Sequence, residues 1–128
     1  MLIKGVFAPG GGGAGASGAA FFIANEACMK RCCKITVLKT NYDPEVAPDW
    51  VHRPCVYVNV GDVYYTGGEH GDKAPEGLCY MAWESLRTIA VTIASGGKVF
   101  GEYETYTGCC PNGGRPVVFL LEPAELEE

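Results

Sequence analysis

One stretch of the chain organises the rest: Gly108-Cys109-Cys110-Pro111-Asn112-Gly113-Gly114-Arg115-Pro116-Val117-Val118-Phe119-Leu120-Leu121. Its last five residues form the most apolar run of the sequence. Because consecutive residues are apolar, both faces of an extended chain would be apolar, which predicts a central strand. The preceding Pro-Asn-Gly is typical of a turn. A turn held by a packed strand is a rigid place for function, and this turn carries two thiols and one guanidinium.

Two further segments complete the predicted fold. Cys33, Ile35 and Val37 alternate with polar residues, which is the period of a half-buried strand. Apolar residues recur at helical spacing between Cys79 and Ser95, and two glycines follow as a stop signal. The predicted apolar stripe consists of Cys79, Ala82, Leu86, Ile89 and Ile93, with Trp83 and Ala90 beside it. We therefore expect an α+β fold in which a small, mostly antiparallel sheet or open barrel packs on one main helix, residues 79–95.

Weaker patterns predict further strands. Val56, Val58 and Val60 alternate before a Gly-Asp turn, and Val63–Tyr65 follows that turn, which predicts two strands or one strand with a bend. Residues 99–107 alternate weakly and predict an exposed edge strand.

A chain of 128 residues fits one domain with its own core. Three regions differ in composition: a Gly/Ala-rich N-terminal extension at 1–28, a single α+β domain at 29–122 and an acidic, frayed tail at 123–128. We expect Met29 to begin the folded domain.

The N-terminal region also contains a G-x-G-x-x-G pattern at Gly13, Gly15 and Gly18. Between a strand at 2–7 and a helix at 19–29, these glycines would cradle a dinucleotide pyrophosphate. Against this, Lys39 stands where an acidic residue is expected, and the rest of the chain lacks βα repeats. A flexible extension is the favoured interpretation, and a dinucleotide-binding fragment remains an alternative.

The overall composition argues against several partners. The net charge of −5 leaves no basic excess to neutralise nucleic-acid phosphates. The apolar runs are too short for a membrane span, and the N-terminus lacks the apolar core of a signal peptide. We expect a cytoplasmic protein whose seven cysteines, an odd number, are mostly reduced.

Four motifs follow one another along roughly residues 30–122: Cys33–Lys39, Pro54-Cys55 ahead of Gly61-Asp62, Pro75-Glu76-Gly77-Leu78-Cys79 with Ala82-Trp83, and Cys109-Cys110 with Gly114-Arg115-Pro116-Val117-Val118-Phe119. As a set, these motifs resemble a family of small, uncharacterised conserved proteins of bacteria and archaea. The resemblance implies a compact domain with recurring cysteines that match Cys55, Cys79 and Cys110. It implies no activity.

Cys55, Cys79 and Cys110 each stand at the boundary of a predicted element, where distant segments can converge. A cysteine at a helix N-terminus meets the positive end of the helix dipole, which favours the thiolate. With Cys109 as a fourth sulfur, the set would suit zinc or an iron–sulfur cluster; alternatively it would suit thiol redox chemistry. The alternative is that these cysteines are small core residues with a purely structural role.

Arg115 follows Asn112, Gly113 and Gly114, whose backbone N–H groups suit an anion-binding nest. It would bind a small anionic ligand, or else pair with loop carbonyls or a carboxylate. The sequence thus predicts a thiolate metal-binding or thiol-redox protein, with a non-catalytic interaction module as the alternative. It identifies no reaction, and it leaves open whether the chain forms a homo-oligomer.

Overall fold

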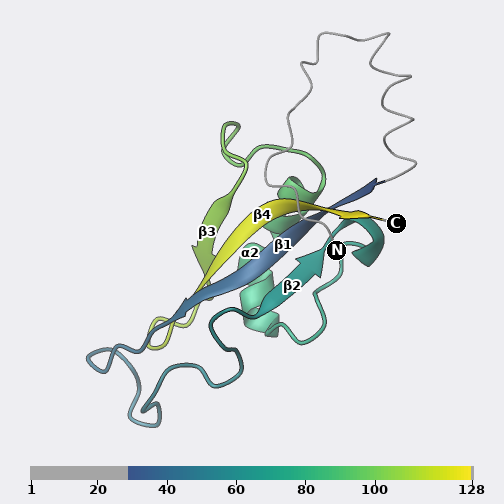
Figure 1. The fold of residues 1–128 in the computed structure, drawn as a ribbon. Helices are drawn as coiled ribbons and strands as arrows, with labels where there is room; N and C mark the ends of the chain where they lie inside the picture. Colours follow the sequence, from purple (N-terminus) through teal and green to yellow (C-terminus); the bar gives the residue numbers. More distant parts are fainter. Residues whose placement is uncertain (1–28, 128) are drawn as a thin grey trace, which may run out of the picture.

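In a computed structural model, which describes residues 29–127, a four-stranded antiparallel sheet packs on one helix (Figure 1). The elements are β1 (Met29–Thr40), β2 (Val63–Thr66), a short 3-10 helix η1 (Gly68–His70), α2 (Tyr80–Ala94), β3 (Tyr106–Cys109) and β4 (Val117–Glu127). The strand order is β2-β1-β4-β3, and the sheet does not close on itself. The expected α+β class is confirmed, in its open-sheet form.

The two long strands β1 and β4 form the centre of the sheet. Their pairing runs from Met29 opposite Glu127 to Thr40 opposite Val117, with one irregularity between Val37 and Lys39. On its other side β4 pairs with β3, from Leu121 opposite Tyr106 to Val118 opposite Cys109. The apolar run 117–121 is therefore a central strand, as its composition predicts.

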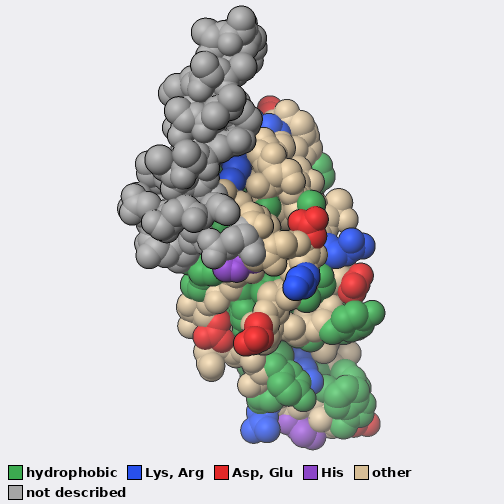
Figure 2. Space-filling view, turned by 90° about the vertical axis from the view of Figure 1, so that its right-hand side faces the viewer, with side chains coloured by type: hydrophobic (Ala, Val, Ile, Leu, Met, Phe, Trp, Pro, Cys, Tyr) green, Lys and Arg blue, Asp and Glu red, His purple; other side chains and the backbone are tan. Residues whose placement is uncertain are grey.

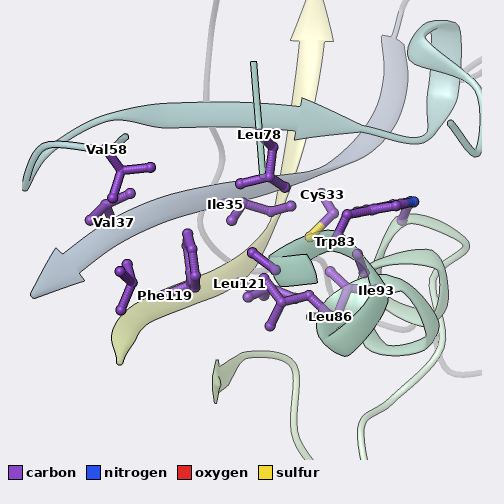
Figure 3. Packing of buried hydrophobic residues seen from close by; sticks show 14 of the residues in the cluster. Cys33, Ile35, Val37, Val58, Leu78, Trp83, Leu86, Ile93, Phe119 and Leu121 are labelled. Carbon is purple, nitrogen blue, oxygen red and sulfur yellow. The ribbon is translucent and has the colours of Figure 1, made fainter. Parts of the chain in front are cut away.

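The core lies between α2 and one face of the sheet (Figure 3). Cys33, Ile35 and Val37 of β1 are at most 1% exposed, which confirms the predicted inward face. The side chains that meet them include Val58, Leu78, Trp83, Leu86, Ile93, Phe119 and Leu121. Burying each such apolar side chain contributes roughly 1.5–3 kcal/mol, so this layer holds the helix on the sheet.

The helix α2 has the predicted position within one residue at each end, and Cys79 and Ser95 are its caps. After Ser95 the N–H of Gly96 donates to the Ile93 carbonyl, and the N–H of Gly97 donates to the Thr92 carbonyl. This pair of bonds is a Schellman motif, and it needs a left-handed residue, which Gly96 supplies with a φ of 92°.

Two weaker strand predictions were wrong in their range. Residues 56–60 form no strand: Val58 is buried, but Val56 and Val60 are 54% and 62% exposed. Instead the turn at Gly61 and Asp62 reaches β1, where it exchanges backbone hydrogen bonds of 2.9 Å with Val37. An alternating pattern makes a strand only where a neighbouring edge offers hydrogen bonds, and here the turn already occupies that edge of β1.

The predicted edge strand at 99–107 is displaced along the chain. Residues 99–103 form a tight turn closed by a bridge between Val99 and Tyr103, with Phe100 at a positive φ of 54°. The edge strand is β3, which begins at Tyr106.

The C-terminal residues also differ from the expectation of a frayed tail. Pro123–Glu127 continue β4 and pair with Met29–Cys33. Ala124 is fully buried opposite Cys32, which is also fully buried. Pro123 lies beyond the last β3 pair, where β4 has β1 as its neighbour in the described sheet, and an edge position tolerates a proline.

The glycines of the predicted dinucleotide motif, Gly13, Gly15 and Gly18, lie outside the described residues. Within residues 29–127 all three strand pairings are antiparallel. No helix in this part of the chain is long and apolar enough to cross a membrane. Acidic and basic side chains are interspersed over the face of the molecule shown in Figure 2.

Candidate functional site

A hollow of about 290 Å³ opens where three distant segments meet. Its wall includes Cys55, Cys79, Cys110 and Arg115. Tyr57, Met81, Pro111 and Asn112 complete the wall. We call this hollow the thiol cavity. It joins the loop before β2, the N-terminus of α2 and the turn between β3 and β4.

Cys110 closes the base of the β3–β4 turn through two hydrogen bonds with Val117. Its backbone N–H donates to the Val117 carbonyl at 3.1 Å, and its Sγ accepts the Val117 N–H at 3.4 Å. The side chain is half-buried against the core. This pair of bonds fixes the Cys110 side chain at the base of the turn.

The rest of the turn is held by hydrogen bonds within the turn and by a hydrogen bond from the segment that follows β1. Inside, Asn112 Oδ1 accepts the N–H groups of Gly114 and Arg115 at 3.1 and 3.2 Å. Outside, the N–H of Asp43 donates to the Gly114 carbonyl at 2.9 Å. A Cβ on Gly114 would lie 2.9 Å from the Ala47 Cα, so glycine is required at this close approach. The loop is therefore rigidly placed beside the cavity.

These bonds change how an anion could be held at the turn. The Gly114 amide that was expected to belong to an anion-binding nest donates to Asn112 within the turn. The Arg115 guanidinium, in contrast, makes no hydrogen bond or ion pair with the described residues. It is half-buried in the cavity wall. The Arg115 side chain is therefore available to an anion, whereas the Gly114 N–H is engaged within the turn.

Cys79 and Cys55 reach the cavity from the other two segments. Cys79 is the N-cap of α2: its carbonyl accepts the Trp83 N–H at 2.9 Å, and its side chain is exposed. Cys55 follows Pro54 and is half-buried against the core. Burial raises the pKa of the nearby Tyr64 phenol, and Asp62 and Cys55 add to that rise.

Cys109 is not brought to this group. It is the last residue of β3 and lines a different hollow, formed with Ser85, Leu86 and Val118 among others. Consecutive side chains of an extended segment point to opposite sides, so Cys109 and Cys110 diverge. The Ser85 hydroxyl donates to the Cys109 carbonyl at 3.0 Å and ties the strand to α2.

Cys32 and Cys33 are structural residues, fully buried on opposite faces of β1. Burial raises the pKa of the Cys33 thiol to about 12, and the neighbouring Cys32 adds to the rise. A buried neutral thiol is chemically inert. Cys33, Cys55, Cys79, Cys109 and Cys110 are free cysteines. Within the same range, no three His, Cys, Asp or Glu side chains are grouped so that they could hold a metal ion.

Three residues of the cavity wall were not predicted as site residues. Met81 looks like an ordinary position in the first turn of a helix, and Tyr57 is one of seven tyrosines, any of which could line a pocket or pack on the sheet. Asn112 was predicted as a turn residue whose backbone N–H belongs to an anion-binding nest, and its side chain was not considered. These residues lie close to the cysteines because of tertiary packing, which the spacing of residues along the sequence does not encode.

Comparison of the chain with protein-family models, curated proteins and solved structures finds no match.

Proposed function

We propose that this protein performs thiol–disulfide chemistry in the thiol cavity. The observation that carries the proposal is the convergence of three free cysteines from three distant segments on one hollow. Cysteines that only fill a core are sealed from solvent, as Cys32 and Cys33 are. Cys79 is exposed, and Cys55 and Cys110 are half-buried, so small reagents have access to all three.

Cys110 is the best candidate for the attacking sulfur. The Val117 N–H donates to its Sγ, and the Arg115 guanidinium lines the same cavity. A hydrogen-bond donor to sulfur is a group that can stabilise a thiolate, and the thiolate is the nucleophilic form of cysteine. Cys55 and Cys79 have no such donor to sulfur among their described contacts, and they are candidates for the resolving thiol.

The exchange proceeds in two balanced steps. The Cys110 thiolate attacks one sulfur of an external disulfide, whose S–S bond breaks and whose other half leaves as a thiolate. A second cavity cysteine then loses its proton to water and attacks the Cys110 sulfur. The first half of the reagent leaves as a second thiolate, and two cavity cysteines are joined. The protein has lost two electrons and the external disulfide has gained them.

Site-resolved oxidation tests this proposal. The protein is treated with a small organic disulfide, quenched at intervals with a thiol-alkylating reagent and mapped by peptide mass spectrometry. We expect mixed disulfides first at Cys110, then a bond between Cys110 and Cys55 or Cys79, while Cys32 and Cys33 stay reduced. Cys110→Ser abolishes the internal bond, and Cys109→Ser is the matched control because Cys109 lies outside the cavity.

Two results would count against thiol exchange. Cavity thiols that react no faster than Cys109 and never bond to one another would favour a non-catalytic interaction module. One zinc or iron per chain after purification without oxygen, with the three thiols protected together, would make the cavity a metal centre instead. Met81 would then offer a thioether as a further soft ligand.

A further inference from the structure

We infer that the thiol cavity selects small organic disulfides and thiols that carry a negative charge, and that the Arg115 side chain binds the anionic group of these ligands. The inference rests on the proposed thiol exchange and names its substrate class.

The cavity wall carries one positive charge and no negative charge. Of its eight residues, Arg115 is cationic, and none is Asp or Glu. The Arg115 guanidinium has no ion pair or hydrogen bond among residues 29–127. A half-buried guanidinium has five N–H donors to satisfy, and a carboxylate or a similar oxyanion fits their planar geometry. An anionic group on the ligand would supply the partner that the chain itself does not.

Asn112 adds a second donor beside Arg115. Its Oδ1 accepts two backbone N–H groups, which orients the side-chain amide. The amide N–H₂ group is thereby left for other partners, and it makes no hydrogen bond within the described part of the chain. Two residues of one turn whose side-chain donors have no partner among residues 29–127 thus line the cavity that Cys110 also lines.

The size of the cavity sets the class of ligand. A volume of about 290 Å³ is at the lower end of the range for small-molecule sites. It suits a compact organic molecule rather than a folded domain. Because Cys110 and Arg115 belong to the same rigid turn, a ligand with a short linker between its sulfur and its anionic group can engage both.

The net charge of the whole chain acts against a preference for anionic ligands. Its net charge is −5, so long-range electrostatics alone would favour a cationic reagent at every exposed thiol. A preference for anions confined to the cavity thiols therefore requires a local cause. Cys109 is an internal reference for the long-range effect, because its hollow has no charged residue in its wall.

The test compares three disulfides of similar size: dithiodiglycolate, which is anionic, cystamine, which is cationic, and the neutral disulfide of 2-mercaptoethanol. Initial rates of mixed-disulfide formation are measured at each cysteine by mass spectrometry, in low and in high salt. We expect the anionic-to-cationic rate ratio at Cys110 to exceed the ratio at Cys109 by about tenfold or more, since hydrogen bonds to charged groups are the stronger kind. Salt should reduce the difference.

Variants of Arg115 locate the cause. Arg115→Gln should bring the Cys110 ratio to that of Cys109, and Arg115→Lys should keep part of the preference because it keeps the charge. Arg53→Gln is the matched control, since it removes the same charge two residues from Cys55 but outside the cavity wall. Circular dichroism and thermal unfolding check that each variant is folded.

The outcomes separate the two proposals. Cavity thiols that exchange with the same charge preference as Cys109, and that are unchanged by Arg115→Gln, would overturn the anion selectivity and leave thiol exchange standing. Cavity thiols that form no mixed disulfide with any of the three reagents would overturn both.

Discussion

At the scale of single residues, burial divides the described cysteines into two kinds. Cys33 is fully buried in the core between β1 and α2, where a neutral thiol packs as a small apolar group. Cys55, Cys79 and Cys110 keep access to solvent, and the N–H of Val117 donates to Cys110 Sγ. The same residue type thus serves the core in one place and remains available for chemistry in another.

The buried Cys33 predicts a loss of stability in alkali. Its pKa rises to about 12 in the folded protein from an ordinary value of 9.0, because burial disfavours the charged thiolate. Between these pH values the folded protein keeps the proton and the unfolded chain loses it. The stabilisation is therefore complete below pH 9.0 and is lost as the pH rises towards 12, at about 1.4 kcal/mol per pH unit.

Urea unfolding at a series of pH values above neutrality measures this slope. Cys33→Ala removes the titrating group and should flatten the curve, whereas Cys109→Ala, at an exposed site, should not. An equal slope in all three proteins would contradict the assignment.

At the scale of elements, local sequence signals place the helix and the central strands closely, and the C-terminal end of α2 shows the physical reason. The helix stops where Gly96 turns left-handed and its amide, with that of Gly97, satisfies two of the last carbonyls of the helix. The edges of the sheet are less well defined by sequence. Val56 and Val60 have the right alternation for a strand, but no described strand edge pairs with them.

A substitution at the helix stop tests this account. Gly96→Ala should destabilise the protein by about 1–2 kcal/mol, because an L-residue with a side chain is strained at a φ of 92°. The nearest atom to the added Cβ is 3.9 Å away, so the cost is conformational and not steric. Thermal or urea unfolding measures the difference.

Gly113→Ala is the matched control for this substitution. Gly113 has no positive φ and open space around it, so its change should stay within about 0.5 kcal/mol. A loss at Gly113 as large as the loss at Gly96 would mean that backbone conformation is not the cause.

At the scale of the whole molecule, the described residues 29–127 contain four strands and a helix that share one core, and they also contain the residues that line the thiol cavity. The helix α2 contacts all four strands, and the turn after β3 is tied to the segment after β1 by backbone hydrogen bonds. The domain is thus stabilised by contacts between residues far apart in the sequence.

This arrangement predicts that a chain starting at Met29 folds. It retains both central strands and the helix, so we expect a single cooperative thermal transition within a few degrees of the full chain and the same reactivity of the cavity thiols. Circular dichroism melting together with thiol mapping checks both properties. The full chain measured in parallel is the control, and a trimmed chain without a cooperative transition would show that residues 1–28 are needed for folding.

The sequence alone was enough for the elements whose signals are local. The apolar run 117–121, the alternation of Cys33, Ile35 and Val37, and the helical stripe from Cys79 to Ile93 each predict a buried face, because burial repeats with the period of the backbone. Of that stripe Cys79 is the exception, since it is exposed at the start of the helix. The same periodicity failed at 56–60 and 99–107, and composition failed at Pro123–Glu127, which pairs with β1. Strand pairing depends on a partner elsewhere in the chain.

The segment Gly108–Leu121 shows which features the sequence predicts and which features depend on the tertiary structure. Its sequence predicted the turn and the central strand, and it marked both thiols and Arg115 as candidates. Only the tertiary structure separated Cys109 from Cys110 and placed Cys110 and Arg115 along one cavity with Cys55 and Cys79. The physical reason is that a cavity wall is made of residues close in space but distant along the chain, and their proximity is set by the packing of α2 and the loops against the sheet.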